Sequence, residues 1–188
     1  FYYATSGDAW FNNTNWLNHN VHECLWFSVL QVPCDHDGIF QNLQLWSNNL
    51  QGILPLELFL LTSLQSVLLV GNQLLGGTLS SLIGHLSSLE GLGITTTELS
   101  GTIPTELGTL SNLSKIFLTT NHLRQQIPTE LGRLTQLEVL GLDSNVGITI
   151  QLMLCCDIIN YNSNTFPLLF LVFTKRTSQA QFLLSLVI

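Results

Sequence analysis

The residues best suited to metal chemistry lie near the N-terminus of this sequence. Two cysteines and three histidines fall within one short segment, as His19, His22, Cys24, Cys34 and His36. Thiolates and imidazoles are the ligands that zinc prefers in proteins. Their spacing matches no standard zinc finger. The residues by themselves therefore leave the state of the two cysteines open.

Other groups of residues give no sign of catalysis. The sequence lacks a phosphate-binding GxxxxGK[ST] loop, a GxSxG elbow, an HExxH helix and the kinase motifs. The segment 35–38 begins like a calcium loop, but the later acidic ligands are missing. Gly91-Leu92-Gly93 begins like a dinucleotide loop and lacks the third glycine. We therefore predict that the protein is not an enzyme and needs no metal or cofactor.

Composition excludes several classes of partner. The chain has 188 residues, of which 46% are hydrophobic, enough for one buried core and one domain. No Lys or Arg precedes residue 115, whereas acidic residues before it include Asp8, Glu23, Asp35, Asp37, Glu57, Glu90 and Glu98. Nucleic acids and anionic membranes need cations, so neither is an expected partner. No apolar stretch reaches the ~18 residues of a membrane-spanning helix.

A ladder of apolar residues returns about every 24 residues and dominates the rest of the sequence. Its first rungs are Phe40, Leu64, Leu89, Leu113 and Leu137. The next buried columns are Leu43, Val67, Leu92, Ile116 and Leu140, then Leu45, Leu69, Ile94, Leu118 and Leu142. Alternation of this kind predicts a short strand with one buried face in every repeat. A unit of this length cannot bury its own apolar face, so we expect the repeats to stack into a solenoid.

The second half of each repeat combines polar, glycine and proline signals. Asparagine or threonine follows each strand, as Asn48, Asn72, Thr97, Asn121 and Asn145, where an amide can bond turn backbone. We expect the four asparagines to be structural and Thr97 to be the weakest rung. An apolar column at Leu50, Leu74, Leu99 and Leu123 comes next, followed by Gly52, Gly77, Gly101 and the exception Gln125. Gln125 predicts a slightly different turn, and the closing segment, as in 105–110, predicts a short helix or 3₁₀ turn.

The segment from Leu99 to Gly108 reads LSGTIPTELG and resembles the LxGxIPxxLGxL signature of plant-type leucine-rich repeats. The resemblance covers roughly residues 40 to 150, with four complete repeats and a fifth that departs after Asn145. It implies an α/β solenoid, a right-handed leucine-rich-repeat superhelix with a concave parallel β-sheet and short helical or 3₁₀ convex segments. We divide the chain into an N-terminal cap (1–38), repeats (39–150) and a non-repeat tail (151–188).

The resemblance also implies the nature of both ends. Trp10, Trp16 and Trp26 resemble the aromatic residues of the N-terminal cap, and Cys24 and Cys34 are then expected to form its disulfide. Zinc binding and free thiols remain alternatives. The tail, with the adjacent pair Cys155-Cys156, is either an improvised C-terminal cap or a gene-model or truncation artefact. The sequons Asn12-Asn13-Thr14 and Asn112-Leu113-Ser114 fit N-glycosylation.

The expected function follows from the strand positions that face away from the core. We predict that ligand-binding side chains lie on this concave face at Gln44, Trp46, Leu68, Val70, Thr95, Lys115, Phe117, Thr119 and Asp143. A solvated sheet face has no need of its own for large apolar side chains. The resemblance implies a secreted or cell-surface module that recognises a protein or peptide. The alternative is a binder of a repetitive surface, either cell-wall polysaccharide or ice, suggested by the threonines at 95–97 and 119–120.

Overall fold

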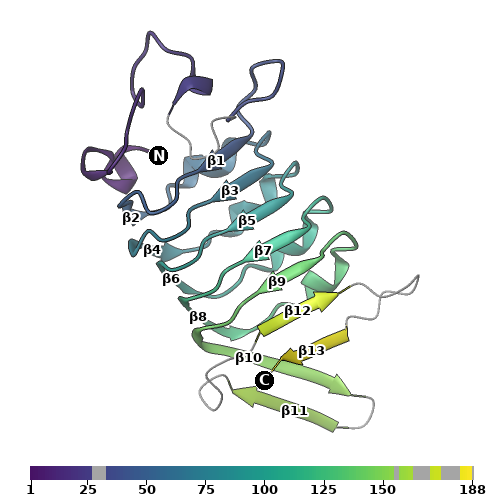
Figure 1. Ribbon diagram of the computed structural model, residues 1–188. Helices are drawn as coiled ribbons and strands as arrows, with labels where there is room; N and C mark the ends of the chain where they lie inside the picture. The colour runs from purple at the N-terminus through teal and green to yellow at the C-terminus, as the bar shows by residue number, and fades with distance from the viewer. Residues whose placement is uncertain (27–32, 155–156, 163–169, 175–182, 188) are drawn as a thin grey trace.

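The computed structural model describes residues 1–26, 33–154, 157–162, 170–174 and 183–187. The chain winds through five turns, each contributing one strand to a parallel sheet that runs along one side of the stack (Figure 1). This concave sheet consists of β1 (Asn42–Gln44), β3 (Ser66–Leu68), β5 (Gly91–Gly93), β7 (Lys115–Phe117) and β9 (Val139–Gly141). The predicted leucine-rich-repeat solenoid is confirmed.

A second parallel sheet follows the asparagine column, and the sequence analysis did not predict it. Its strands are β2 (Gln51–Ile53), β4 (Leu74–Thr78), β6 (Glu98–Gly101), β8 (Asn121–Gln126) and β10 (Asn145–Leu154). We interpreted this segment as a turn because it contains glycine. The strands form because backbone groups of successive repeats pair in register, as Gly77 does with Leu99.

Short 3₁₀ turns close each complete repeat on the side opposite the concave sheet. They are η4 (Leu56–Leu60), η5 (Ser81–His85), η6 (Thr105–Thr109) and η7 (Thr129–Arg133). Pro55 and Pro104 precede η4 and η6 with extended backbone angles, Pro128 precedes η7, and Ser80 takes this place in η5. Proline suits this position because it fixes φ without removing a needed donor. The predicted 3₁₀ alternative is therefore the observed one.

Two details of the second half of the repeat differ from expectation. Leu75 is 1% exposed and belongs to the buried column, whereas Leu74 is 58% exposed. The second repeat is one residue longer than the others, and the extra residue lies between Asn72 and Leu75, which are three positions apart where Thr97 and Leu99 are two. Gln125 has a φ of +71°, in the same left-handed region as Gly101 at +82°. Its turn is thus like that of the other repeats, held by the strands on either side, and our expectation of a different turn was wrong.

The C-terminal strands extend past the repeats. β10 runs on to Leu154 and pairs in antiparallel fashion with β11 (Asp157–Asn162) at the edge of the second sheet. A second hairpin joins β12 (Phe170–Thr174) and β13 (Leu183–Val187), and β12 lies beside β9 (Figure 1). Cys155 and Cys156 lie outside the described residues.

The asparagine column forms a hydrogen-bonded ladder inside the stack. Asn72 is fully buried, and its amide donates to the carbonyl oxygens of Leu45 (2.8 Å) and Val70 (3.3 Å). Its Oδ1 accepts the backbone N–H groups of Asn48 (2.9 Å) and Leu50 (3.1 Å). One side chain therefore pairs backbone groups of two successive repeats. The amides of Asn121 and Asn145 donate in the same way, to the carbonyl oxygens of Ile94 and Leu118.

Thr97 interrupts this ladder. Its hydroxyl donates to Oδ1 of Asn121 and accepts the N–H of Leu99 at 3.3 Å. A hydroxyl has one proton and no amide group, so it cannot also reach the carbonyl of Leu69, which is equivalent to those of Leu45 and Ile94. Thr97 therefore links the turn of the third repeat to the fourth repeat. It lacks the bond to the second repeat that an asparagine amide would make.

Replacing Asn121 with Leu should destabilise the solenoid. The substitution removes the amide bonds to Ile94 and Leu118 and leaves buried backbone groups unpaired, at about 1 to 3 kcal/mol each. Chemical denaturation should therefore show a clear loss of unfolding free energy. An exposed neighbour, His122→Leu, is the matched control and should change stability little. Equal stability of Asn121→Leu and the wild type would contradict the structural role of the column.

Replacing Thr97 with Asn should have the opposite effect. An amide at this position can donate to Leu69 and complete the ladder, which should raise the unfolding free energy by about 1 kcal/mol. Thr97→Val keeps the side-chain shape but removes the acceptor for Leu99, so it should lower stability. Thermal melting of the three proteins tests the order Asn, Thr, Val. A different order would mean that the missing bond at Thr97 does not limit the stability of the solenoid.

Candidate functional site

Aromatic residues seal the N-terminal end of the stack. Trp10 contacts Trp16 with ring centroids 5.0 Å apart, and Trp16 contacts Trp26 at 4.8 Å. Trp26 in turn lies 6.4 Å from Phe40, the first rung of the ladder. The row of rings thus runs from the cap to the first repeat, and apolar surface at the open end is covered. The cap tryptophans are therefore scaffold.

The cap also continues the hydrogen bonding of the ladder. Asn12 donates its backbone N–H to Oδ1 of Asn48, and the Asn48 amide donates to the carbonyl of Asn12, both at 2.8 Å. Within the cap, the Tyr2 hydroxyl donates to Asp8 Oδ1 at 2.9 Å. Burial and this bond to Asp8 raise the pKa of Tyr2. Backbone of the cap thus occupies the place that a preceding repeat would have.

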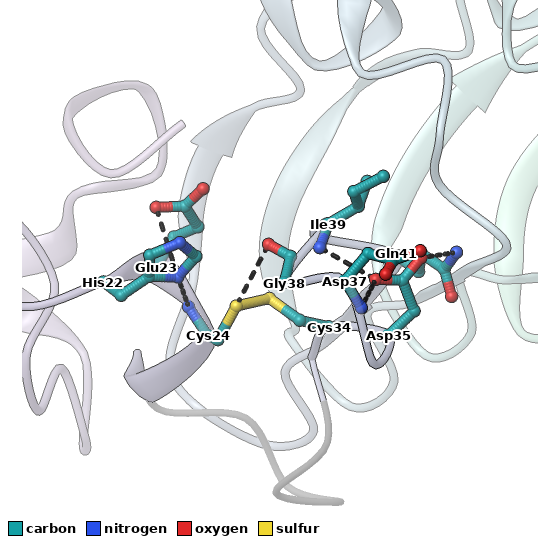
Figure 2. Close-up of a disulfide and its surroundings, with 9 residues drawn as sticks. All are labelled: His22, Glu23, Cys24, Cys34, Asp35, Asp37, Gly38, Ile39 and Gln41. Atoms are coloured by element: carbon teal, nitrogen blue, oxygen red, sulfur yellow. Dashed lines mark hydrogen bonds and ion pairs between the residues drawn. A yellow bond between two sulfur atoms is a disulfide. The ribbon is translucent and has the colours of Figure 1, made fainter.

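A disulfide joins Cys24 and Cys34, as Figure 2 shows. Their α-carbons lie 5.3 Å apart, so the predicted pairing is confirmed. Cys24 Sγ lies 3.4 Å from the carbonyl oxygen of Gly38. This is a contact and not a hydrogen bond, because a bonded sulfur carries no proton. The bond ties the η3 turn (Glu23–Leu25) to the segment that enters the first repeat.

Among the described residues, one group has the side chains of a metal site, with ligand atoms of His22, Cys24 and Cys34 within 4.8 Å of one another. The sulfurs are bonded to each other, so neither offers the thiolate that zinc requires. The nearby Asp35 carboxylate accepts the N–H groups of Asp37 and Ile39 at 2.9 Å and closes a turn before β1 (Figure 2). In this arrangement the residues have a structural role in the cap.

The concave sheet presents its outward residues in two main columns. One column contains Gln44, Leu68, Gly93, Phe117 and Gly141, which pair across β1, β3, β5, β7 and β9. Backbone hydrogen bonds between successive repeats continue beyond these strands, for example from Ser47 N–H to the Val70 carbonyl at 2.7 Å. These bonds align the second column, which contains Trp46, Val70, Thr95, Thr119 and Asp143. Lys115 begins β7 and is exposed on the same face.

Large side chains of the first column lie over glycines of the next repeat. A β-carbon on Gly93 would come within 2.7 Å of Leu68 Cδ2, and one on Gly141 within 3.3 Å of Phe117 Cδ1. A β-carbon on Gly91, in contrast, would meet nothing within 4 Å. The face therefore has two supported apolar side chains with an open stretch of backbone at Gly91. The spacing of residues in the sequence does not show that these side chains pack over the glycines, although the glycines themselves can be read from the sequence.

The predicted ligand-binding residues differ in how far they reach the surface. Trp46 is 41% exposed and Phe117 is 37% exposed, while Leu68, Val70, Thr95, Thr119 and Asp143 are half-buried. Gln44 does not fit our expectation of an exposed contact, because it is 6% exposed and its amide lies along the sheet, donating to Ser66 Oγ at 3.2 Å. Trp46 and Phe117 are thus the large apolar residues that this face offers most openly.

Comparison with known proteins identifies the class of fold. No protein-family model and no curated protein matches the sequence. A chain of the BIR3–SERK2 complex from Arabidopsis thaliana is 28% identical, with a TM-score of 0.59 over 77% of this chain and 79% of its own. The plant peptide hormone receptor RGFR1, in complex with RGF2, is 35% identical, with a TM-score of 0.56 over 57% of this chain. This chain covers 17% of that receptor chain.

A plant ice-binding protein is also similar, with 27% identity and a TM-score of 0.60 over 68% of this chain and 41% of its own. The repeats, the two sheets and the disulfide-bonded cap define a plant-type leucine-rich-repeat solenoid, similar to receptor ectodomains. This fold is typically non-catalytic. Within the part of the chain that is described, no helix is long and apolar enough to cross a membrane.

Loss of the cap disulfide should lower stability. The bond closes a loop with a sequence separation of 10, and a loop of this size is expected to contribute about 2 to 4 kcal/mol. Thermal melting of the wild type should therefore show a lower midpoint in reductant. The double variant Cys24→Ser, Cys34→Ser should melt at that lower midpoint with or without reductant. A wild-type midpoint that reductant leaves unchanged would contradict a stabilising role.

Proposed function

We propose that the protein is a non-catalytic recognition module that acts outside the cell and binds an extended peptide or a protein segment through its concave sheet. The observation that carries this proposal is the exposure of Trp46 and Phe117 on that sheet. Partly exposed aromatic residues on a rigid surface are common anchors of interfaces. The disulfide fits an oxidising compartment, as expected for a secreted or cell-surface protein.

The similar proteins support this proposal by analogy. RGFR1 is described as a peptide hormone receptor in complex with RGF2, and BIR3 and SERK2 form a complex with each other. This chain spans a small part of RGFR1, so a peptide or protein partner is proposed here only by analogy.

The shape of the surface favours an elongated partner. Trp46 belongs to the first turn and Phe117 to the fourth, so three strand spacings of ~4.8 Å separate their rows by about 14 Å. Gly91 belongs to a third outward column, where it pairs with Ser66 and Lys115, and this column contains neither anchor. A ligand that spans both anchors therefore crosses the second and third repeats at the half-buried side chains of Leu68, Val70 and Thr95. This span suits an extended peptide or a protein edge better than a small molecule.

The double variant Trp46→Ala, Phe117→Ala should bind ligands much more weakly. Loss of an aromatic anchor can cost about 2 kcal/mol or more, so affinity should fall by at least about tenfold. A displayed library of random peptides can be selected on the wild-type protein, and the enriched peptides measured on the variant. Circular dichroism and thermal melting check that the variant remains folded. Unchanged affinity for all enriched peptides in a folded variant would refute the site.

Two further variants sharpen this test. Leu56→Ala, Leu60→Ala removes exposed apolar side chains from η4, on the opposite side of the repeat, and should leave affinity unchanged. Gly91→Tyr adds a ring where a β-carbon meets nothing, so the fold should be retained while the concave face is obstructed. Peptide binding that survives in Gly91→Tyr and is lost in the η4 variant would place the binding surface on the other side.

Ice or polysaccharide binding is the second candidate, because a plant ice-binding protein shares the fold. The threonine array that motivated it is smaller than expected. Thr97 is buried and its hydroxyl is bonded within the ladder, so it cannot contact a surface. Ice-recrystallisation and glycan-array assays of the wild type and of Thr95→Val, Thr119→Val test this candidate. Inhibition of ice growth that depends on these threonines would favour it over peptide recognition.

A further inference from the structure

The segment from Asn12 to Thr14 is a glycosylation sequon that hydrogen bonds hold in a turn. Oδ1 of Asn12 accepts the backbone N–H of Thr14 at 3.0 Å and its hydroxyl at 2.6 Å. The side chains of the two essential residues are therefore already bonded to each other. Within the part of the chain that is described, the Asn12 amide nitrogen makes no hydrogen bond, which leaves both of its protons free.

The surroundings hold this turn at the surface without using the Asn12 side chain. Both bonds between Asn12 and Asn48 involve the backbone of Asn12. Asn13 and Thr14 are exposed, and Asn12 is half-buried. A group attached to the amide nitrogen would therefore disrupt no bond of the cap or of the ladder.

The second sequon has a different arrangement. The Asn112 amide donates to the carbonyl of Ser87 at 3.0 Å, and the Ser114 hydroxyl donates to the carbonyl of Glu90 at 3.1 Å. Both side chains thus bond the preceding repeat and not each other. Leu113 between them is fully buried as a rung of the core. This sequon takes part in the contact between repeats.

We infer that Asn12 is an acceptor of an N-linked glycan. The donor is an oligosaccharide attached to a lipid pyrophosphate. A bond forms between Asn12 Nδ2 and C1 of the first sugar, the bond from C1 to the pyrophosphate oxygen breaks, and the amide loses one proton as the lipid pyrophosphate leaves. The inference rests on the secretory location in the proposed function but not on the concave binding site, because Asn12 belongs to the cap.

Peptide mapping of the full chain, secreted from insect cells, tests the assignment. Residues 1–114 contain no Lys or Arg, so trypsin cannot separate the sequons. A protease that cuts after acidic residues releases 9–23 with Asn12 and 107–130 with Asn112. Treatment with an N-glycosidase should convert Asn12 to aspartate in the first peptide. An unmodified Asn12 in all secreted protein would overturn the inference.

Variants separate glycosylation from folding and from ligand binding. Asn12→Gln and Thr14→Val should each abolish the glycan on the first peptide, whereas Thr14→Ser should keep it. Asn112→Gln is the matched control and should leave the Asn12 glycan in place. Asn12→Gln should still bind the peptides selected on the wild type, so loss of the glycan and loss of recognition are distinguishable. A glycan on 9–23 that survives in Asn12→Gln would also refute the assignment.

Discussion

The need to pair buried backbone groups at every turn is the constraint on which this solenoid depends. Each coil turns sharply after its concave strand, and the turn leaves N–H and C=O groups inside the stack. An unpaired group there costs about 1 to 3 kcal/mol. An asparagine meets this need in every repeat except the third, which has Thr97, because the asparagine amide has both donors and an acceptor. Asn72 pairs groups from two repeats at once, so each rung also sets the spacing to its neighbour.

The same constraint explains features that otherwise look unrelated. The backbone of the cap bonds the Asn48 side chain, because no repeat precedes the first one to provide these partners. The second sheet arises where the chain leaves the ladder, since the bonded turns hold the following segments in register. Gln125 adopts a positive φ for the same reason, although its side chain makes this conformation costly. The ladder thus sets backbone geometry even where the local sequence opposes it.

The sequence was sufficient for the fold because one pattern is repeated several times, and each copy supports the others. It was insufficient where a prediction depended on a single residue. Leu74 and Leu75 are equally apolar neighbours, so the pattern could not tell which enters the core. Gln44 stands at an outward position, but its amide lies back along the sheet because Ser66 offers a partner. The second sheet was missed because its strands form from backbone pairing and carry no alternating pattern.

The concave face shows how a repeating scaffold can still carry an individual surface. The ladder and core need only the buried columns, so the outward positions are free to vary between repeats. Their variation is nevertheless coupled, because Leu68 lies over Gly93 and Phe117 lies over Gly141. A large side chain at one position thus depends on a small one in the next repeat. If the concave face binds a ligand as proposed, this packing would hold the Phe117 ring in place beforehand and lower the entropy cost of binding. The glycines beneath these side chains would then help to prepare the proposed binding surface.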